Sequence, residues 1–141
     1  MPRPAVPAAL LAALACGGLL AGCTKPVPSV TVQSGGTSVR SEAVQYKLDG
    51  KLRTDKAGAK VVDVRAGGVV NISVDKATRD AGWVVVLNGV KASPVLEDRF
   101  AFTFTVPNFN GVSDVALAVF QQPPGGGEAD GAWIFTLHQD N

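Results

Sequence analysis

The fold is decided near the middle of the chain, by the stretch Trp83-Val84-Val85-Val86-Leu87-Asn88-Gly89-Val90. Its first five residues are apolar and rich in valine, which favours an extended strand. Asn88-Gly89 follows, and both residues tolerate the positive φ angles that a type I′ turn requires. The stretch therefore predicts a β-hairpin in which residues 83–87 fold back onto residues 90–93.

Similar segments recur about every ten residues, separated by clusters of Gly, Pro, Asn and Asp. Their apolar-polar alternation and β-branched residues are typical of strands. Helical character is confined to Asp75–Gly82, where Asp75 can cap the first turn and Gly82 can end the helix. The full set of predicted strands is Ser29–Gln33, Glu42–Leu48, Lys60–Arg65, Val69–Val74, Trp83–Leu87, Lys91–Ser93, Arg99–Val106, Val112–Phe120 and Ala132–Gln139.

Two of these segments, Val84–Leu87 and Val115–Phe120, are apolar on both faces, which suits central strands of a packed sheet. In Arg99–Val106 the three phenylalanines and Val106 share one face, which indicates a half-buried strand. Many short strands and little helix predict an all-β fold, an immunoglobulin-like Greek-key β-sandwich of about seven to nine strands with at most one short helix. A closed lipocalin-type barrel is the alternative, but it usually needs a longer chain.

The amino terminus has the pattern of a bacterial lipoprotein signal. Arg3 precedes the apolar segment Ala5–Leu20, which is too short and too rich in small residues for a spanning helix. The segment ends in Leu20-Ala21-Gly22-Cys23, where small residues allow extended entry into a peptidase and the Cys23 thiol accepts the lipid. We therefore predict a lipid anchor at Cys23; the alternatives are an ordinary secreted protein cleaved near Ala21 and a plain core helix.

Three segments follow from this prediction: a signal peptide at 1–22, the lipidated cysteine and a proline-rich tether at 23–28, and a β-sandwich domain at 29–141. Removing the signal leaves 119 residues, the size of one domain. Cys16 leaves with the signal and Cys23 is consumed by lipid, so no disulfide is expected. In an extended polyproline-like path the tether reaches only ~20 Å, so the domain should lie close to the bilayer.

Charge argues against a nucleic-acid partner, because the mature chain has 12 basic and 12 acidic side chains, and nucleic-acid binding needs a basic surface. The charges are uneven. Residues 40–65 carry seven basic and four acidic side chains, whereas residues 97–141 carry one basic and six acidic. A basic flank near the tether is either a solvated face or a surface that turns toward anionic lipid.

Few side chains offer catalytic or metal chemistry. His138 is the only histidine, and we interpret it as an exposed residue near the chain end. With one histidine, no free cysteine and no methionine, the mature chain lacks the ligands of a copper or zinc site. The neighbouring carboxylates Glu97-Asp98 and the pair Glu128 and Asp130 are interpreted as exposed turn residues. We expect no enzyme activity, no metal and no cofactor.

One long irregular segment connects two strongly apolar strands: Gln121-Gln122-Pro123-Pro124-Gly125-Gly126-Gly127-Glu128-Ala129-Asp130-Gly131. Loops of this length inside compact domains are usually functional or disordered. Its glycines make ordering entropically costly. The segment is therefore either a mobile hairpin loop or the candidate binding loop.

The chain resembles a family of small actinobacterial envelope lipoproteins that contain a domain of unknown function. The resemblance rests on the Leu20–Cys23 box and on fold signals, which are Lys25-Pro26, Pro28, Val64-Arg65-Ala66-Gly67, Val69–Asp75, Ala81-Gly82-Trp83 and Leu87-Asn88-Gly89. It implies a lipid-anchored extracytoplasmic domain and no particular site residue.

The function that we expect is a non-enzymatic binding or scaffolding module on the outer face of the cytoplasmic membrane. It would meet another envelope protein through a sheet edge or through the 121–131 loop. The alternative is a small-ligand or lipid carrier with a pocket between the sheets, which Phe100, Phe102, Phe104 and Trp133 would line instead of filling the core.

Overall fold

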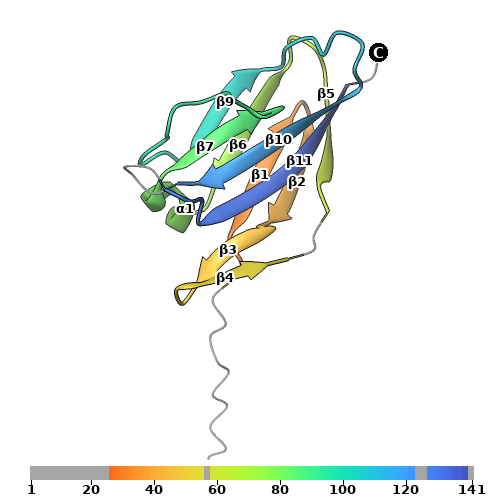
Figure 1. The fold of residues 1–141 in the computed structure, drawn as a ribbon. Helices are drawn as coiled ribbons and strands as arrows, with labels where there is room; N and C mark the ends of the chain where they lie inside the picture. Colours follow the sequence, from red (N-terminus) through yellow and green to blue (C-terminus); the bar gives the residue numbers. More distant parts are fainter. Residues whose placement is uncertain (1–25, 56–57, 123–126, 140–141) are drawn as a thin grey trace, which may run out of the picture.

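The computed structural model describes residues 26–55, 58–122 and 127–139, which form two stacked β-sheets and one short helix (Figure 1). The strands run predominantly between two ends of the domain, and the described chain enters at the end that carries β3 and β4 (Figure 1). The elements are β1 (Ser29–Ser34), β2 (Thr37–Glu42), β3 (Gln45–Leu48), β4 (Lys51–Thr54), β5 (Lys60–Val64), β6 (Val69–Val74), α1 (Lys76–Ala81), β7 (Trp83–Leu87), β8 (Val90–Lys91), β9 (Ala101–Thr105), β10 (Asp114–Gln121) and β11 (Gly131–Gln139).

The sheet topology is that of a Greek-key sandwich. The four-stranded sheet has the order β2-β1-β6-β9, and the seven-stranded sheet has the order β4-β3-β11-β10-β7-β8. The chain changes sheets five times: between β2 and β3, β5 and β6, β6 and β7, β8 and β9, and β9 and β10. The strand β5 joins the seven-stranded sheet by parallel pairing with β11. These connections confirm the predicted immunoglobulin-like fold.

The structure has two more strands than the sequence predicts, β2 and β4. The continuous strand predicted at Glu42–Leu48 is wrong, because the chain changes sheets within it. The Ala43 N–H donates to the Pro28 carbonyl, just before β1, whereas the next N–H, that of Val44, donates to Ala132 in β11. The strand β4 is exposed along its whole length, so it has no apolar alternation by which to predict it.

The predicted hairpin and helix are both confirmed. Asn88 and Gly89 have φ angles of 48° and 79°, as a type I′ turn requires. In α1, the Asp75 carboxylate accepts a 2.9 Å hydrogen bond from the Thr78 N–H, and Gly82 ends the helix with a φ of 87°.

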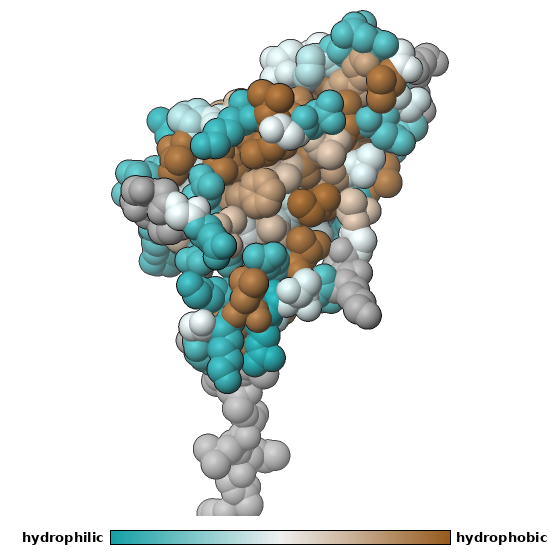
Figure 2. Space-filling view, in the orientation of Figure 1, coloured by the Kyte–Doolittle hydropathy of each residue, from teal (hydrophilic) through white to brown (hydrophobic). Residues whose placement is uncertain are grey.

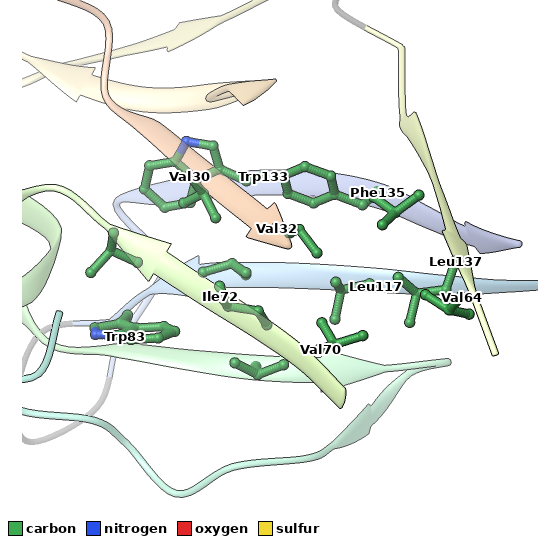
Figure 3. Close-up of a cluster of buried hydrophobic side chains, with 14 of the residues drawn as sticks. Val30, Val32, Val64, Val70, Ile72, Trp83, Leu117, Trp133, Phe135 and Leu137 are labelled. Carbon is green, nitrogen blue, oxygen red and sulfur yellow. The ribbon is translucent and has the colours of Figure 1, made fainter. Parts of the chain in front are cut away.

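The core lies between the two sheets and is filled by side chains from both (Figure 3). Trp133 and Phe135 on β11 point toward Val30 and Val32 on β1, while Ile72 reaches in from β6 (Figure 3). Both tryptophans are completely buried. The Trp133 indole donates to the Pro28 carbonyl at 3.1 Å, so this interior also fixes the start of the domain.

Candidate functional site

The largest feature without a structural explanation is the outward-facing side of β7, β10 and β11. Because successive residues of a strand point to opposite faces, the buried residues Trp83, Val85, Leu117 and Phe135 place their neighbours outward. We call this surface the outer sheet face; its apolar members are Val84, Val86, Ala116, Ala118, Phe120, Ala132 and Ile134.

The strand register makes the outer sheet face continuous. Ala118 pairs with Val86 on one side and with Ile134 on the other, so these three residues form one apolar row. The next row joins Val84, Phe120 and Ala132 by the same pairings. Figure 2 shows a hydrophobic area in this part of the view, over β7, β10 and β11. Val84 and Ala132 are buried. A partner molecule can reach the other members, because Ala116 is exposed and the remaining four are half-buried: Val86, Ala118, Phe120 and Ile134.

The sequence correctly predicts that these strands are central in their sheet. Their outward-facing side chains, however, are not all buried as the inward-facing ones are. Val84 is buried, whereas Ala116 is exposed and Val86, Ala118 and Ile134 are only half-buried. In the sequence, this surface could be detected only as apolar residues at every second position of the strands. The strand register was needed to show that these positions face away from the core and form one surface.

The predicted binding loop is shorter than expected. Gln121 and Gly131 are the last and first residues of β10 and β11, and they pair with each other. The Gln122 N–H donates to the Gly82 carbonyl at 2.9 Å, and the Asp130 N–H donates to the Gln121 carbonyl at 2.9 Å. Both ends of the connection are therefore fixed to the sheet. Residues Pro123, Pro124, Gly125 and Gly126 lie outside the described residues.

Two glycines make the base of this loop possible. A Cβ on Gly131 would lie 2.9 Å from the Trp133 ring, and a Cβ on Gly82 would lie 2.9 Å from the Gln122 carbonyl oxygen. Asp130 also links the loop base to β3, because its carboxylate lies 3.3 Å from the Lys47 ammonium. The loop base and the β3–β4 hairpin thus share one end of the sandwich. Glu128 is exposed.

The predicted anchor and processing residues, Leu20, Ala21, Gly22 and Cys23, lie outside the described part of the chain. The described chain begins at Pro26, and Val27 already packs against the core. Two residues that we assigned to the tether, Val27 and Pro28, therefore contact the domain.

His138 is not an isolated residue at a fraying end. It lies in β11, and its Nδ1 is 2.7 Å from an Asp114 carboxylate oxygen on β10. Its register partner on the other side, in β5, is Asp63. Both of these register partners are carboxylates.

The predicted carboxylate pairs are placed as follows. Glu97 and Asp98 are exposed, and Asp130 is paired with Lys47. Among the residues that the structure describes, no group of three or more His, Cys, Asp and Glu side chains is placed to hold a metal ion.

One carboxylate has a perturbed pKa, and it lies on the surface helix α1. A hydrogen bond from Lys76, supported by one from Arg79, lowers the pKa of Asp80 below its ordinary value. The Lys76–Asp80 spacing of four residues is a common ion pair of helix surfaces. We therefore interpret this network as support for a short helix.

The residues expected to line a carrier pocket do not surround a common cavity. Trp133 is buried in the packed core, Phe102 and Phe104 are half-buried at the edge of the core, and Phe100 is 50% exposed. A hollow of about 670 Å³ lies on the surface, between the β1–β2 turn and the β5–β6 turn. Its rim combines polar residues such as Asp63 and Arg65 with Val64 and Val69, and none of the four aromatic residues lines it.

Within the described ranges, the structure has no helix long and apolar enough to cross a membrane. No protein-family model matches the chain, and neither a curated protein nor a solved structure matches it.

Proposed function

We propose that this protein is a lipid-anchored, extracytoplasmic binding module of a bacterial envelope, and that the outer sheet face receives another envelope protein. The lipid anchor is supported by the sequence Leu20-Ala21-Gly22-Cys23, which resembles the processing box of bacterial lipoproteins. The actinobacterial origin and the non-enzymatic role remain part of the same proposal.

The observation that carries the proposal is the apolar row Val86–Ala118–Ile134 on a solvent-accessible side of the sheet. Apolar side chains gathered on an accessible face mark interaction sites in soluble domains. A face of small and β-branched residues suits the surface of a partner protein, and neither of the two hollows seen among the described residues is lined by members of this face. A partner protein is therefore the occupant that we favour over a bound lipid.

The test is site-specific photocrosslinking in the native envelope. A photoreactive residue is placed at Ala118, in the middle of the outer sheet face, in the intact lipidated protein. Matched probes are placed at Thr103, which is exposed on the other sheet, and at Glu128, in the described part of the loop. We expect a discrete protein adduct from position 118, and at least tenfold less from position 103.

A second arm tests the anchor. Cys23→Ala should abolish labelling by a tagged fatty acid and release the protein from membranes, because the lipid supplies most of the membrane affinity of a small domain with balanced net charge. Labelling of the variant at the wild-type level would overturn the lipoprotein assignment. Adducts from position 128 alone would move the binding site to the loop, and equal adducts from positions 103 and 118 would exclude a specific face.

A further inference from the structure

The β3–β4 hairpin is an addition to the sandwich that contributes little to its core. β4 pairs only with β3, and all four of its residues are exposed. β3 in turn pairs with β11 at Gly131 and Ala132, and the Lys47 N–H donates to the Asp130 carbonyl at 3.0 Å. Tyr46 is the side chain of the hairpin that packs against the core. Asp49 and Gly50 have φ angles of 50° and 75°, which makes the tip a tight two-residue turn. The hairpin is therefore a short, defined projection whose purpose is not explained by stability.

The hairpin lies beside the point where the described chain enters the domain. Ala43, just before β3, is hydrogen-bonded to Pro28, so the hairpin begins beside the first described residues. Figure 1 shows the hairpin projecting from the end where the described chain enters. Cys23 precedes Pro26 by three residues, a reach of at most about 11 Å. A four-residue strand extends about 13 Å, so the hairpin tip and a lipid anchor can reach one plane.

The surface of the hairpin has the chemistry that fits anionic headgroups. Lys47 is paired with Asp130, but within the described residues neither Lys51 nor Arg53 forms an ion pair. Between them lies Leu52, whose side chain is 57% exposed. Aspartates lie at the tip and after β4, but residues 40–65 as a whole carry three more basic than acidic side chains. Because successive residues of a strand point to opposite faces, Lys51 and Arg53 extend from one face of β4 and Leu52 from the other. The exposed edge of the hairpin thus presents two cations and one apolar side chain, which together suit contact with an anionic membrane surface.

We propose that the β3–β4 hairpin lies against the anionic headgroups of the membrane and sets the orientation of the domain. This inference rests on the proposed lipid anchor. The strands extend away from the hairpin end (Figure 1), so this contact makes the sandwich stand on the bilayer. The outer sheet face then looks sideways, along the membrane plane, where a membrane-bound partner can reach it.

The test uses the mature lipidated protein in vesicles and one environment-sensitive fluorophore. The mature chain has no free cysteine if Cys23 is lipidated, so Leu52→Cys supplies a unique thiol on the hairpin. Val112→Cys is the matched control, because Val112 is 55% exposed and lies just before β10, at the opposite end of β10 from Gln121 and the loop base. We expect the probe at position 52 to shift to shorter wavelength on anionic vesicles only. The probe at position 112 should not respond.

Charge reversal and salt test the mechanism. K51E/R53E should abolish the shift, since each Lys or Arg contributes about fivefold in affinity for an anionic surface, or about 25-fold for two. The control R65E/K91E changes net charge equally on exposed residues outside the hairpin, and it should retain the shift. Salt at 1 M should also remove the shift, because the screening length falls to about 3 Å. An unchanged probe at position 112 and an unchanged circular dichroism spectrum show that the variants are folded.

The outcomes separate this inference from the proposed function. Protein that does not float with vesicles contradicts the lipid anchor itself. Floating protein with a silent probe at position 52, or with the same shift on neutral vesicles, overturns the hairpin contact alone. Loss of the shift in both K51E/R53E and R65E/K91E would show a general effect of net charge, and would also overturn the proposed hairpin contact. A shift that needs native envelope proteins would assign the hairpin to a protein receptor instead of lipid.

Discussion

The two outward sides of the sandwich differ in chemistry although they belong to the same fold. On the four-stranded sheet the outward positions are polar and bond to one another: Asn71 donates to Gln33 at 3.3 Å and accepts from Thr103 at 3.0 Å. On the seven-stranded sheet the corresponding central positions are Val86, Ala118 and Ile134.

The four-stranded sheet has the outward side chains expected of a solvent-exposed face, whereas the seven-stranded sheet does not. A sheet with one solvated side ordinarily alternates apolar-inward and polar-outward residues, and β1, β6 and β9 largely follow that rule. The strands β7, β10 and β11 depart from it without a second apolar layer that would explain the departure in the described part of the fold. The apolar character of this side is the basis of the proposed binding face.

The largest effect should come from the interior that both sheets share. Phe135→Ala should lower the free energy of unfolding by about 3–5 kcal/mol, because a fully buried aromatic side chain is replaced by a cavity. The measurement is chemical denaturation of the mature domain. Thr136→Ala, one residue further on the outward side, is the control and should cost below about 1 kcal/mol. Similar losses for the two variants would contradict the inward-outward assignment of β11.

A smaller effect is expected on the polar side. Asn71→Ala removes the hydrogen bonds to Gln33 and Thr103, each with a net stabilisation of about 0.5–1.5 kcal/mol when well shielded. Because these groups can bond to water instead, we expect a loss near the lower figure. Partner capture from the envelope should not change. A reduction of capture by this variant would show that the four-stranded side also binds, and would remove the contrast between the faces.

The sequence predicted the parts of the fold that depend on local chemistry. Asn88-Gly89 formed its turn because both residues adopt positive φ, and Asp75 capped α1 because its carboxylate reaches the Thr78 N–H. The strands with alternating or continuous apolar residues were found for the same local reason.

The remaining features depend on contacts between distant segments. The break at Ala43–Val44 follows from pairing with Pro28 on one side and Ala132 on the other, which no local pattern contains. Likewise, β5 joins β11 in parallel across more than 70 residues of sequence. The candidate surface could be predicted only in part. The sequence shows that β7 and β10 are apolar on both faces, but only the register with β11 shows that their outward residues form one face.

The smallest change in stability should come from the outer sheet face, and it provides the strictest test of the contrast. Ile134→Thr keeps a β-branched residue in β11 and exposes a hydroxyl to water, so the free energy of unfolding should fall by less than about 1 kcal/mol. The same substitution at the fully buried Ile72 removes apolar volume and buries a hydroxyl, and should cost about 3 kcal/mol.

Ile134→Thr should have a large effect on partner binding although its effect on stability is small. If Ile134 is central to a partner interface, crosslinking from position 118 should fall about tenfold while the melting temperature stays nearly constant, because central apolar residues dominate interface affinity. Membrane retention through Cys23 should be unaffected, which separates the anchor from the binding face. A stable Ile134→Thr protein that crosslinks like the wild type would mean that the apolar residues of this face do not contact the partner. A loss of stability equal to that of Ile72→Thr would instead mean that the outer sheet face is packed within the folded protein, and that its apolar character serves stability.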